Sequence, residues 1–177
     1  KLIKNPPEKY RPVPFWSWNT QLCTEETKWQ INEMKKAGIG GFFMHARGGL
    51  TTKYLGKDWM DNVRASIKEA EKLGMYAWGY DENGWPSGFV GGKLLENEDF
   101  RARFLEYEIK DIFDDNAFGV YKETDCGFVR IEKAEEGVSS YHTVYLRISP
   151  ANTDILNPAV VDAFISETHE KYYERFA

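Results

Sequence analysis

Apolar and polar positions follow a regular order along the first half of the chain. Three short runs rich in apolar and aromatic residues have the length of strands, and they lie at 11–19, 39–47 and 75–80. Between them, apolar residues recur every three or four positions, as on one face of a helix, first from Thr24 to Gly38 and then over 58–73. The order β-α-β-α-β with short turns predicts parallel strands joined by right-handed crossovers.

The pattern changes in the second half. Residues 101–148 hold short β-like runs separated by Gly, Asp and Asn, which predicts a small antiparallel insert. A helical pattern returns at 157–176, where Asn157 is a suitable N-cap and Pro158 suits the first helical position. We therefore expect three parts: the first βαβαβ units at 1–97, a β-rich insert at 98–150 and a returning helix at 151–177.

Three strand–helix units fit either a small open α/β sheet or the front of a (β/α)8 barrel. A whole barrel needs at least roughly 200 residues, whereas the chain has 177 and spends part of them on the insert. The expected fold class is α/β, a partial (β/α)8 TIM-type barrel made of the first three βα units, with an antiparallel β insert. An incomplete barrel leaves a strand edge uncovered, so we expect self-association through that edge.

Composition and charge exclude several classes of partner. The net charge is -5 and no basic run occurs, so nucleic acid is not expected as a partner. No stretch reaches the roughly 18 apolar residues of a membrane helix, so no membrane partner is expected either. The motifs GxGxxG, HExxH and CxxC are missing, and so is a P-loop. We therefore expect neither a cofactor nor a metal.

The candidate chemistry gathers at the expected carboxyl ends of the three strands, where parallel α/β folds place their sites. Aromatic residues make up 15% of the chain, which fits either a core rich in rings or a sugar-binding cleft. The candidates for substrate binding are Trp16, Trp18, Asn19, His45, Arg47, Tyr80 and Trp85. The tryptophans of the first strand could serve packing only, and His45 could be a hydrogen-bonded core histidine.

Asp81 and Glu82 are the catalytic candidates, in the stretch "YDENGWPSG" that ends the third strand. Side-chain alternation places Glu82 on the same face as Trp78 and Tyr80, so we expect it to point into the cleft. Asp81 would then support the following turn by accepting backbone N–H groups. Either carboxylate could instead form a structural ion pair with Arg47. Because His45 and Arg47 also occupy a strand end, we expect both within hydrogen-bonding reach of the two acids.

Several of these motifs together resemble a known family. The stretches "PFWSWN", "EMKKAGIGGFFMHAR", "YDENGWPSG" and "ILNPAVVDAFISETHEKYYERF" look like the front of the catalytic barrel of large bacterial glycoside hydrolases related to the α-L-rhamnosidases of glycoside hydrolase family 106. The resemblance covers residues 12–95 and about 150–176, but not the insert. It implies a (β/α)8 fold, a glycan substrate and a further acidic motif on the next strand.

The chemistry of glycoside hydrolysis sets what the chain can do. The reaction usually needs two carboxyl groups on opposite sides of the scissile bond, and adjacent residues of one strand point to opposite faces. The chain therefore supplies one carboxylate at most. We expect a fragment of an α-L-rhamnosidase-like glycoside hydrolase that is inactive by itself. The alternatives are a non-catalytic sugar-binding or scaffold domain and, less favoured, a complete small α/β enzyme.

Overall fold

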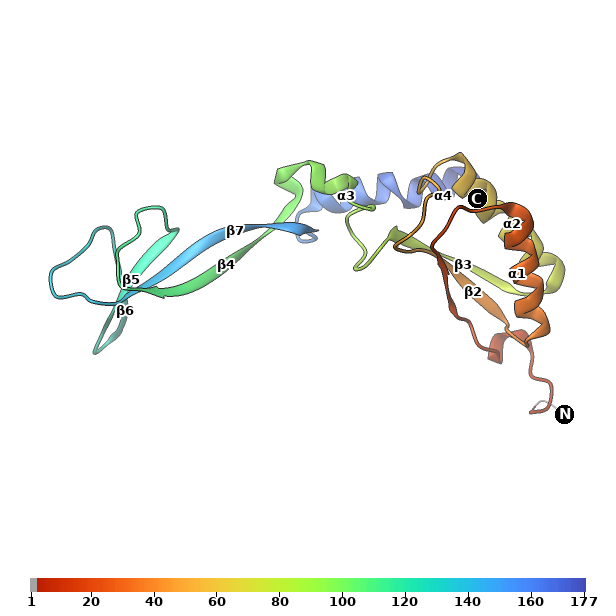
Figure 1. Cartoon of the computed structure of the whole chain (residues 1–177), viewed down its shortest axis with the longest axis horizontal. Helices are drawn as coiled ribbons and strands as arrows, with labels where there is room; N and C mark the ends of the chain where they lie inside the picture. Colours follow the sequence, from red (N-terminus) through yellow and green to blue (C-terminus); the bar gives the residue numbers. More distant parts are fainter. Residues whose placement is uncertain (1–2) are drawn as a thin grey trace.

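The computed structural model describes residues 3–177, which form two separate sheets (Figure 1). The strands are β1 (Phe15–Trp18), β2 (Gly41–Ala46), β3 (Tyr76–Asn83), β4 (Arg101–Lys110), β5 (Gly119–Thr124), β6 (Gly127–Ile131) and β7 (Tyr141–Thr153). The α-helices are α1 (Thr24–Lys36), α2 (Lys57–Leu73), α3 (Pro158–Glu167) and α4 (His169–Phe176). Short 3₁₀ helices lie at Glu8–Tyr10, Lys93–Glu96 and Glu98–Phe100.

The first sheet is parallel, with the strand order β1-β2-β3, which confirms the predicted pairing. Its register pairs Phe15 with Phe43 and Phe43 with Trp78. Helices α1 and α2 cover one face of this sheet (Figure 1). The core between them contains Trp16, Trp18, Ile31, Phe42, Met44, Ala46, Trp59, Met60, Val63, Ala70 and Met75.

The opposite face of the parallel sheet is open. Four rings stack across it in the order Phe15, Phe43, Trp78 and Tyr76, with neighbouring centroids 5.3–5.4 Å apart. Phe15 is 52% exposed and Tyr76 is 46% exposed. Parallel sheets are normally covered on both faces, so this open aromatic face departs from the usual arrangement. Residues 3–177 do not form a closed barrel.

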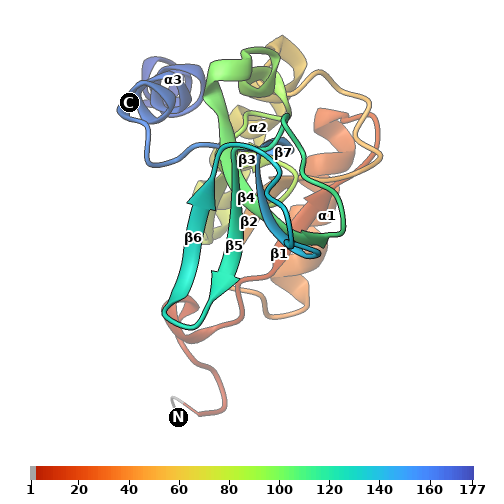
Figure 2. The same cartoon turned by 90° about the vertical axis from the view of Figure 1, so that its left-hand side faces the viewer.

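The second sheet is antiparallel, with the order β4-β7-β5-β6; it extends away from the parallel sheet in Figure 1 and lies in front of it in Figure 2. One of its faces packs on a small core of Val120, Ile131 and Tyr141. The two ends of the segment that forms this sheet lie next to each other. Arg101 pairs with Thr153, and the Asp154 N–H donates to the Phe100 carbonyl at 2.8 Å. The predicted division into three domains stays a prediction.

The last helical segment is divided in two, where the sequence predicted one helix over 157–176. The break lies at Thr168, which is fully buried and has non-helical φ and ψ of -122° and -75°. Its hydroxyl donates to the Phe164 carbonyl at 2.6 Å, a local bond that competes with the helical pattern. The expected cap is confirmed, since the Asn157 side chain accepts the Ala159 N–H. No helix within residues 3–177 combines the length and apolar character needed to cross a membrane.

Candidate functional site

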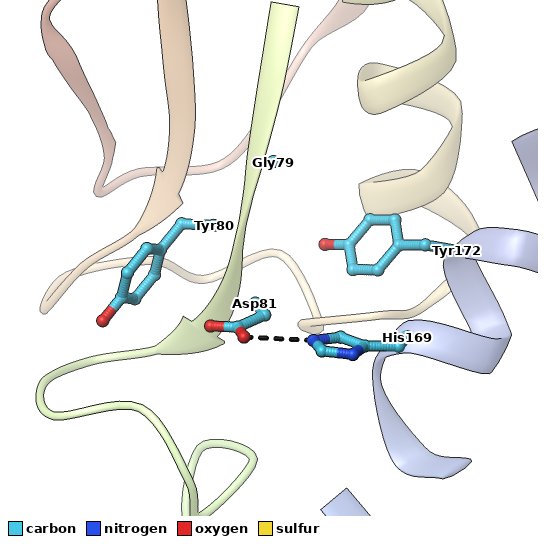
Figure 3. A pocket seen from close by; sticks show the side chains of 5 residues that line it. All are labelled: Gly79, Tyr80, Asp81, His169 and Tyr172. Atoms are coloured by element: carbon cyan, nitrogen blue, oxygen red, sulfur yellow. Dashed lines mark hydrogen bonds and ion pairs between the residues drawn. The ribbon is translucent and has the colours of Figure 1, made fainter. Parts of the chain in front are cut away.

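An open pocket of about 590 Å³ lies beside the carboxyl end of β3 (Figure 3). The strand contributes Gly79, Tyr80 and Asp81, and α4 contributes His169 and Tyr172. The two helical residues are three positions apart, so they share one face of α4. The pocket therefore joins two segments that are separated by the whole antiparallel insert.

Asp81 is the carboxylate that lines this pocket. One of its oxygens, Oδ2, lies 3.1 Å from His169 Nε2, and the Ser87 hydroxyl donates to the other, Oδ1, at 2.8 Å. The Asp81 side chain is 35% exposed and that of His169 is 53% exposed. Asp81 is thus both oriented by the protein and accessible to a ligand.

Glu82 is placed differently from the sequence expectation. The side chain is completely buried and does not point into the open pocket. Its carboxylate accepts five backbone N–H hydrogen bonds of 2.5–3.0 Å, from Asn83, Gly88, Phe89, Val90 and Gly91. The expected orientation of Glu82 is therefore wrong, and so is the expectation that Asp81 supports the turn, because Glu82 does so. A direct catalytic role for Glu82 stays a prediction, and its burial argues against it.

The local backbone explains why alternation fails here. The pairing of β2 with β3 shifts between Met44 and Ala46, because Met44 pairs with Gly79 whereas Ala46 pairs with Asn83. Two extra residues on β3 end the simple alternation of faces at this point. The loop that follows then folds back onto Glu82, helped by positive φ angles at Gly88 and Gly91. The carboxylate thereby becomes the centre of the loop.

Tyr80 and Trp85 form an aromatic stack at the same end of the sheet. Their ring centroids lie 6.0 Å apart with planes 16° from parallel, and Trp85 is 68% exposed. Burial, followed by the negative charges of Asp81 and Glu82, raises the pKa of Tyr80. The phenol therefore stays neutral around pH 7, and the exposed indole offers a flat apolar surface.

His45 is a buried residue that packs against the Tyr80 ring of this stack. It is 1% exposed and contacts the Tyr80 ring edge-on at 4.3 Å between centroids. Burial lowers the pKa of His45, so the ring is neutral near pH 7, and its Nε2 lies 3.2 Å from the Gly84 carbonyl oxygen. Within residues 3–177, neither His45 nor the exposed Arg47 forms a hydrogen bond or ion pair with Asp81 or Glu82. The predicted contacts of these two residues are therefore wrong.

The candidates from the first strand lie on the other side of the sheet. Trp16 and Trp18 are buried against the helices, and Trp16 Nε1 donates to the Gln30 side chain at 2.9 Å. Phe15 and Ser17 occupy the open face instead, opposite Phe43 and His45. The expected cleft orientation of both tryptophans is wrong. Asn19 is exposed at the end of β1, outside the pocket beside β3.

Sequence reasoning missed His169 and Tyr172, because their contacts cross the insert. Tyr172 accepts a hydrogen bond from Trp59 Nε1 at 2.9 Å, which ties α4 to the core. Burial raises the pKa of Tyr172 to about 12, so it remains a neutral hydroxyl. The 169/172 spacing on one helix face is the signal that could have indicated a shared surface. Within residues 3–177, no group of three or more His, Cys, Asp or Glu side chains is placed to hold a metal ion.

Comparisons with known proteins give a limited result. No family model and no curated protein matches the chain. Among solved structures, it is similar to part of a rhamnosidase from Novosphingobium sp. PP1Y, with a TM-score of 0.49 and 22% sequence identity. The match covers 66% of this chain and 12% of the rhamnosidase chain, so this chain spans only a small part of that protein's length.

Proposed function

We propose that the chain is a segment of a carbohydrate-active glycoside hydrolase barrel, and that it holds a sugar at the carboxyl end of β3. The observation that carries this proposal is the ring stack of half-buried Tyr80 with exposed Trp85, where Tyr80 and the accessible carboxylate of Asp81 line the same open pocket. An indole face packs against the C–H groups of a pyranose, and a carboxylate accepts hydrogen bonds from its hydroxyl groups. The combination suits a neutral sugar.

Within this proposal, the two acids have separate roles. Asp81 contacts the sugar and is the candidate acid or base, with His169 held 3.1 Å away as its partner. Glu82 is a positioning residue, because it holds the loop that carries Trp85 through five backbone N–H groups. The second carboxyl group that hydrolysis requires comes from a strand outside this segment. By the resemblance of its motifs, α-L-rhamnosides are the first substrates to test.

A non-catalytic sugar-binding role is the second candidate. Among the described residues, Asp81 is the only carboxylate that lines the pocket beside β3. General acid–base catalysis by one group contributes about 10²–10⁴-fold, far below the 10⁶–10¹⁷-fold acceleration that is typical of enzymes. We therefore expect the isolated chain to bind sugar without hydrolysing it. Robust release of nitrophenol from a nitrophenyl glycoside by the isolated chain would contradict this.

Binding is tested through the indole N–H signals of the ¹⁵N-labelled chain. Titration with methyl α-L-rhamnopyranoside should shift the Trp85 signal in a saturable way, because Trp85 is exposed and stacks on Tyr80, which lines the pocket. Trp85→Ala should abolish the response of the β3 residues. The matched control is Trp29→Ala, since Trp29 is 58% exposed but lies on α1. An unchanged Trp85 signal with this and other neutral sugars would refute the proposed function.

A further inference from the structure

A second pocket lies on the antiparallel sheet, on the face opposite its small core. Its volume is about 300 Å³, and all four strands contribute to it. The lining residues are Tyr107 of β4, Tyr121 of β5, Phe128 of β6, and His142 and Val144 of β7. Cross-strand pairing places Tyr107 opposite Val144 and Tyr121 opposite His142. The sheet register itself therefore brings three aromatic rings and a histidine together.

Gly119 opens the space between these side chains. It lies opposite Val144 on the neighbouring strand, and the Tyr121 ring leans over it. A Cβ atom at position 119 would lie 3.1 Å from Tyr121 Cε2 and 3.3 Å from its hydroxyl oxygen. Any side chain here would push the ring away and occupy part of the pocket, so this glycine is a determinant of the pocket's shape.

The pocket combines apolar walls with groups that can form hydrogen bonds. The Tyr107 hydroxyl and His142 Nδ1 share a hydrogen bond of 2.5 Å, and the two rings stack with centroids 5.8 Å apart. Phe128 contacts His142 edge-on at 4.6 Å between centroids. None of the lining residues is an Asp, Glu, Lys or Arg, and the Glu123 carboxylate lies 3.9 Å from His142 Nε2.

We propose that this pocket is an accessory binding site for one pyranose ring of a neutral glycan. A charged ligand would lose hydration without meeting an Asp, Glu, Lys or Arg side chain among the lining residues. The Tyr107 hydroxyl and His142 Nδ1 already bond to each other, so it is the Tyr121 hydroxyl that a sugar hydroxyl can pair with and a hydrocarbon ligand cannot. The volume lies at the lower end of ligand pockets, about 300–1,000 Å³, which suits a single ring. The site shares no residue with the pocket beside β3, and it does not require that the β3 pocket bind sugar.

The test follows the whole ¹⁵N-labelled chain by NMR during titration with methyl α-L-rhamnopyranoside and methyl α-D-glucopyranoside. At least one sugar should produce saturable shifts at Tyr121 and His142. Tyr107→Ala and Phe128→Ala should each weaken that binding by about tenfold through loss of a packed ring. Gly119→Ala should weaken it as well while every ring is retained. The matched control is Phe104→Ala, since Phe104 is 50% exposed and lies on β4 like Tyr107, but on the other face of the sheet.

Each outcome decides the proposal. Signal shifts at the antiparallel sheet with an unchanged Trp85 signal would support the accessory site and refute sugar binding at β3. Signal shifts restricted to β3 would refute the accessory site and leave the proposed function standing. Equal responses to 4-methylphenol and to the sugars would overturn it in favour of an apolar docking site. Unchanged affinity in Gly119→Ala and Phe128→Ala, with intact β4–β7 amide signals, would also overturn it.

Discussion

Replacing Glu82 by Gln tests the assignment of this residue as the anchor of the loop after β3. Gln has nearly the same shape, but it exchanges one carboxylate oxygen for an NH₂ group. In the protein, Oε1 accepts two backbone N–H groups and Oε2 accepts three. The best placement of the amide keeps its oxygen at the Oε2 position and turns its NH₂ group toward two backbone donors. Those two hydrogen bonds are lost, and the three that remain no longer have a charged acceptor.

The size of the effect follows from this count. Each hydrogen bond to a charged acceptor contributes about 1.5–3 kcal/mol, so the loss of two lowers the free energy of unfolding by about 3–6 kcal/mol. Domains of this kind have total stabilities of about 5–15 kcal/mol, so the loss is large. We expect lower urea midpoints by circular dichroism and faster amide exchange at Gly88–Gly91. Glu82→Asp, which keeps the charge but shortens the side chain, should fall between the wild type and Glu82→Gln.

Asp81→Asn is the matched control. It changes a carboxylate to an amide at the adjacent position, where the side chain is 35% exposed and water can replace lost contacts. We expect its stability to change by less than about 1 kcal/mol. If Glu82→Gln unfolds at the wild-type urea concentration and its loop amides keep their protection, the anchoring role is refuted. A stable Glu82→Gln protein that has lost only sugar binding would instead favour the direct contact expected from alternation.

Three further predictions concern packing, pH and association. Gly41→Ala should lower the urea midpoint, because its Cβ would lie 2.5 Å from the Tyr76 carbonyl oxygen. Gly79→Ala should be tolerated, because nothing lies within 4 Å of its Cβ. Equal urea midpoints for the two variants would contradict this prediction. Burial lowers the pKa of His45, so below about pH 6.5 the unfolded chain binds a proton that the folded chain does not. The free energy of unfolding should therefore decrease as the pH is lowered. In a series of urea titrations at different pH values, His45→Gln should reduce this decrease. The β3 edge and the open aromatic face should cause self-association, and a monomer at every concentration in sedimentation equilibrium would refute it.

The arrangement of the strands could be predicted from sequence because it depends on local patterns. The parallel sheet, its two crossover helices and the later antiparallel strands all follow from apolar periodicity and turn residues. Which face of β1 packs against the helices could not be predicted in the same way. Alternation groups Trp16 with Trp18 and Phe15 with Ser17, but aromatic residues occur in both groups. Only the packing of the helices decides which group is buried.

The candidate site was harder to predict because it depends on irregular and distant contacts. The register shift after Met44 ends the alternation on which the orientation of Glu82 was based. The partner of Asp81, His169, lies 88 positions later in the sequence, beyond the insert. The break at Thr168 turns this histidine into the first residue of α4. The 169/172 spacing indicates a shared helix face, but it does not identify Asp81 as the partner of His169.

The junction between the two sheets has a consequence for how such a chain can change over evolutionary time. Residues 101 and 153 are paired, and Phe100 and Asp154 share a backbone hydrogen bond, so the ends of the intervening segment meet. A segment whose ends meet can be gained, lost or exchanged while the flanking backbone keeps its path. Related chains could therefore carry a short turn or an entirely different module at this point. The helix that supplies His169 and Tyr172 would still return to the same strand.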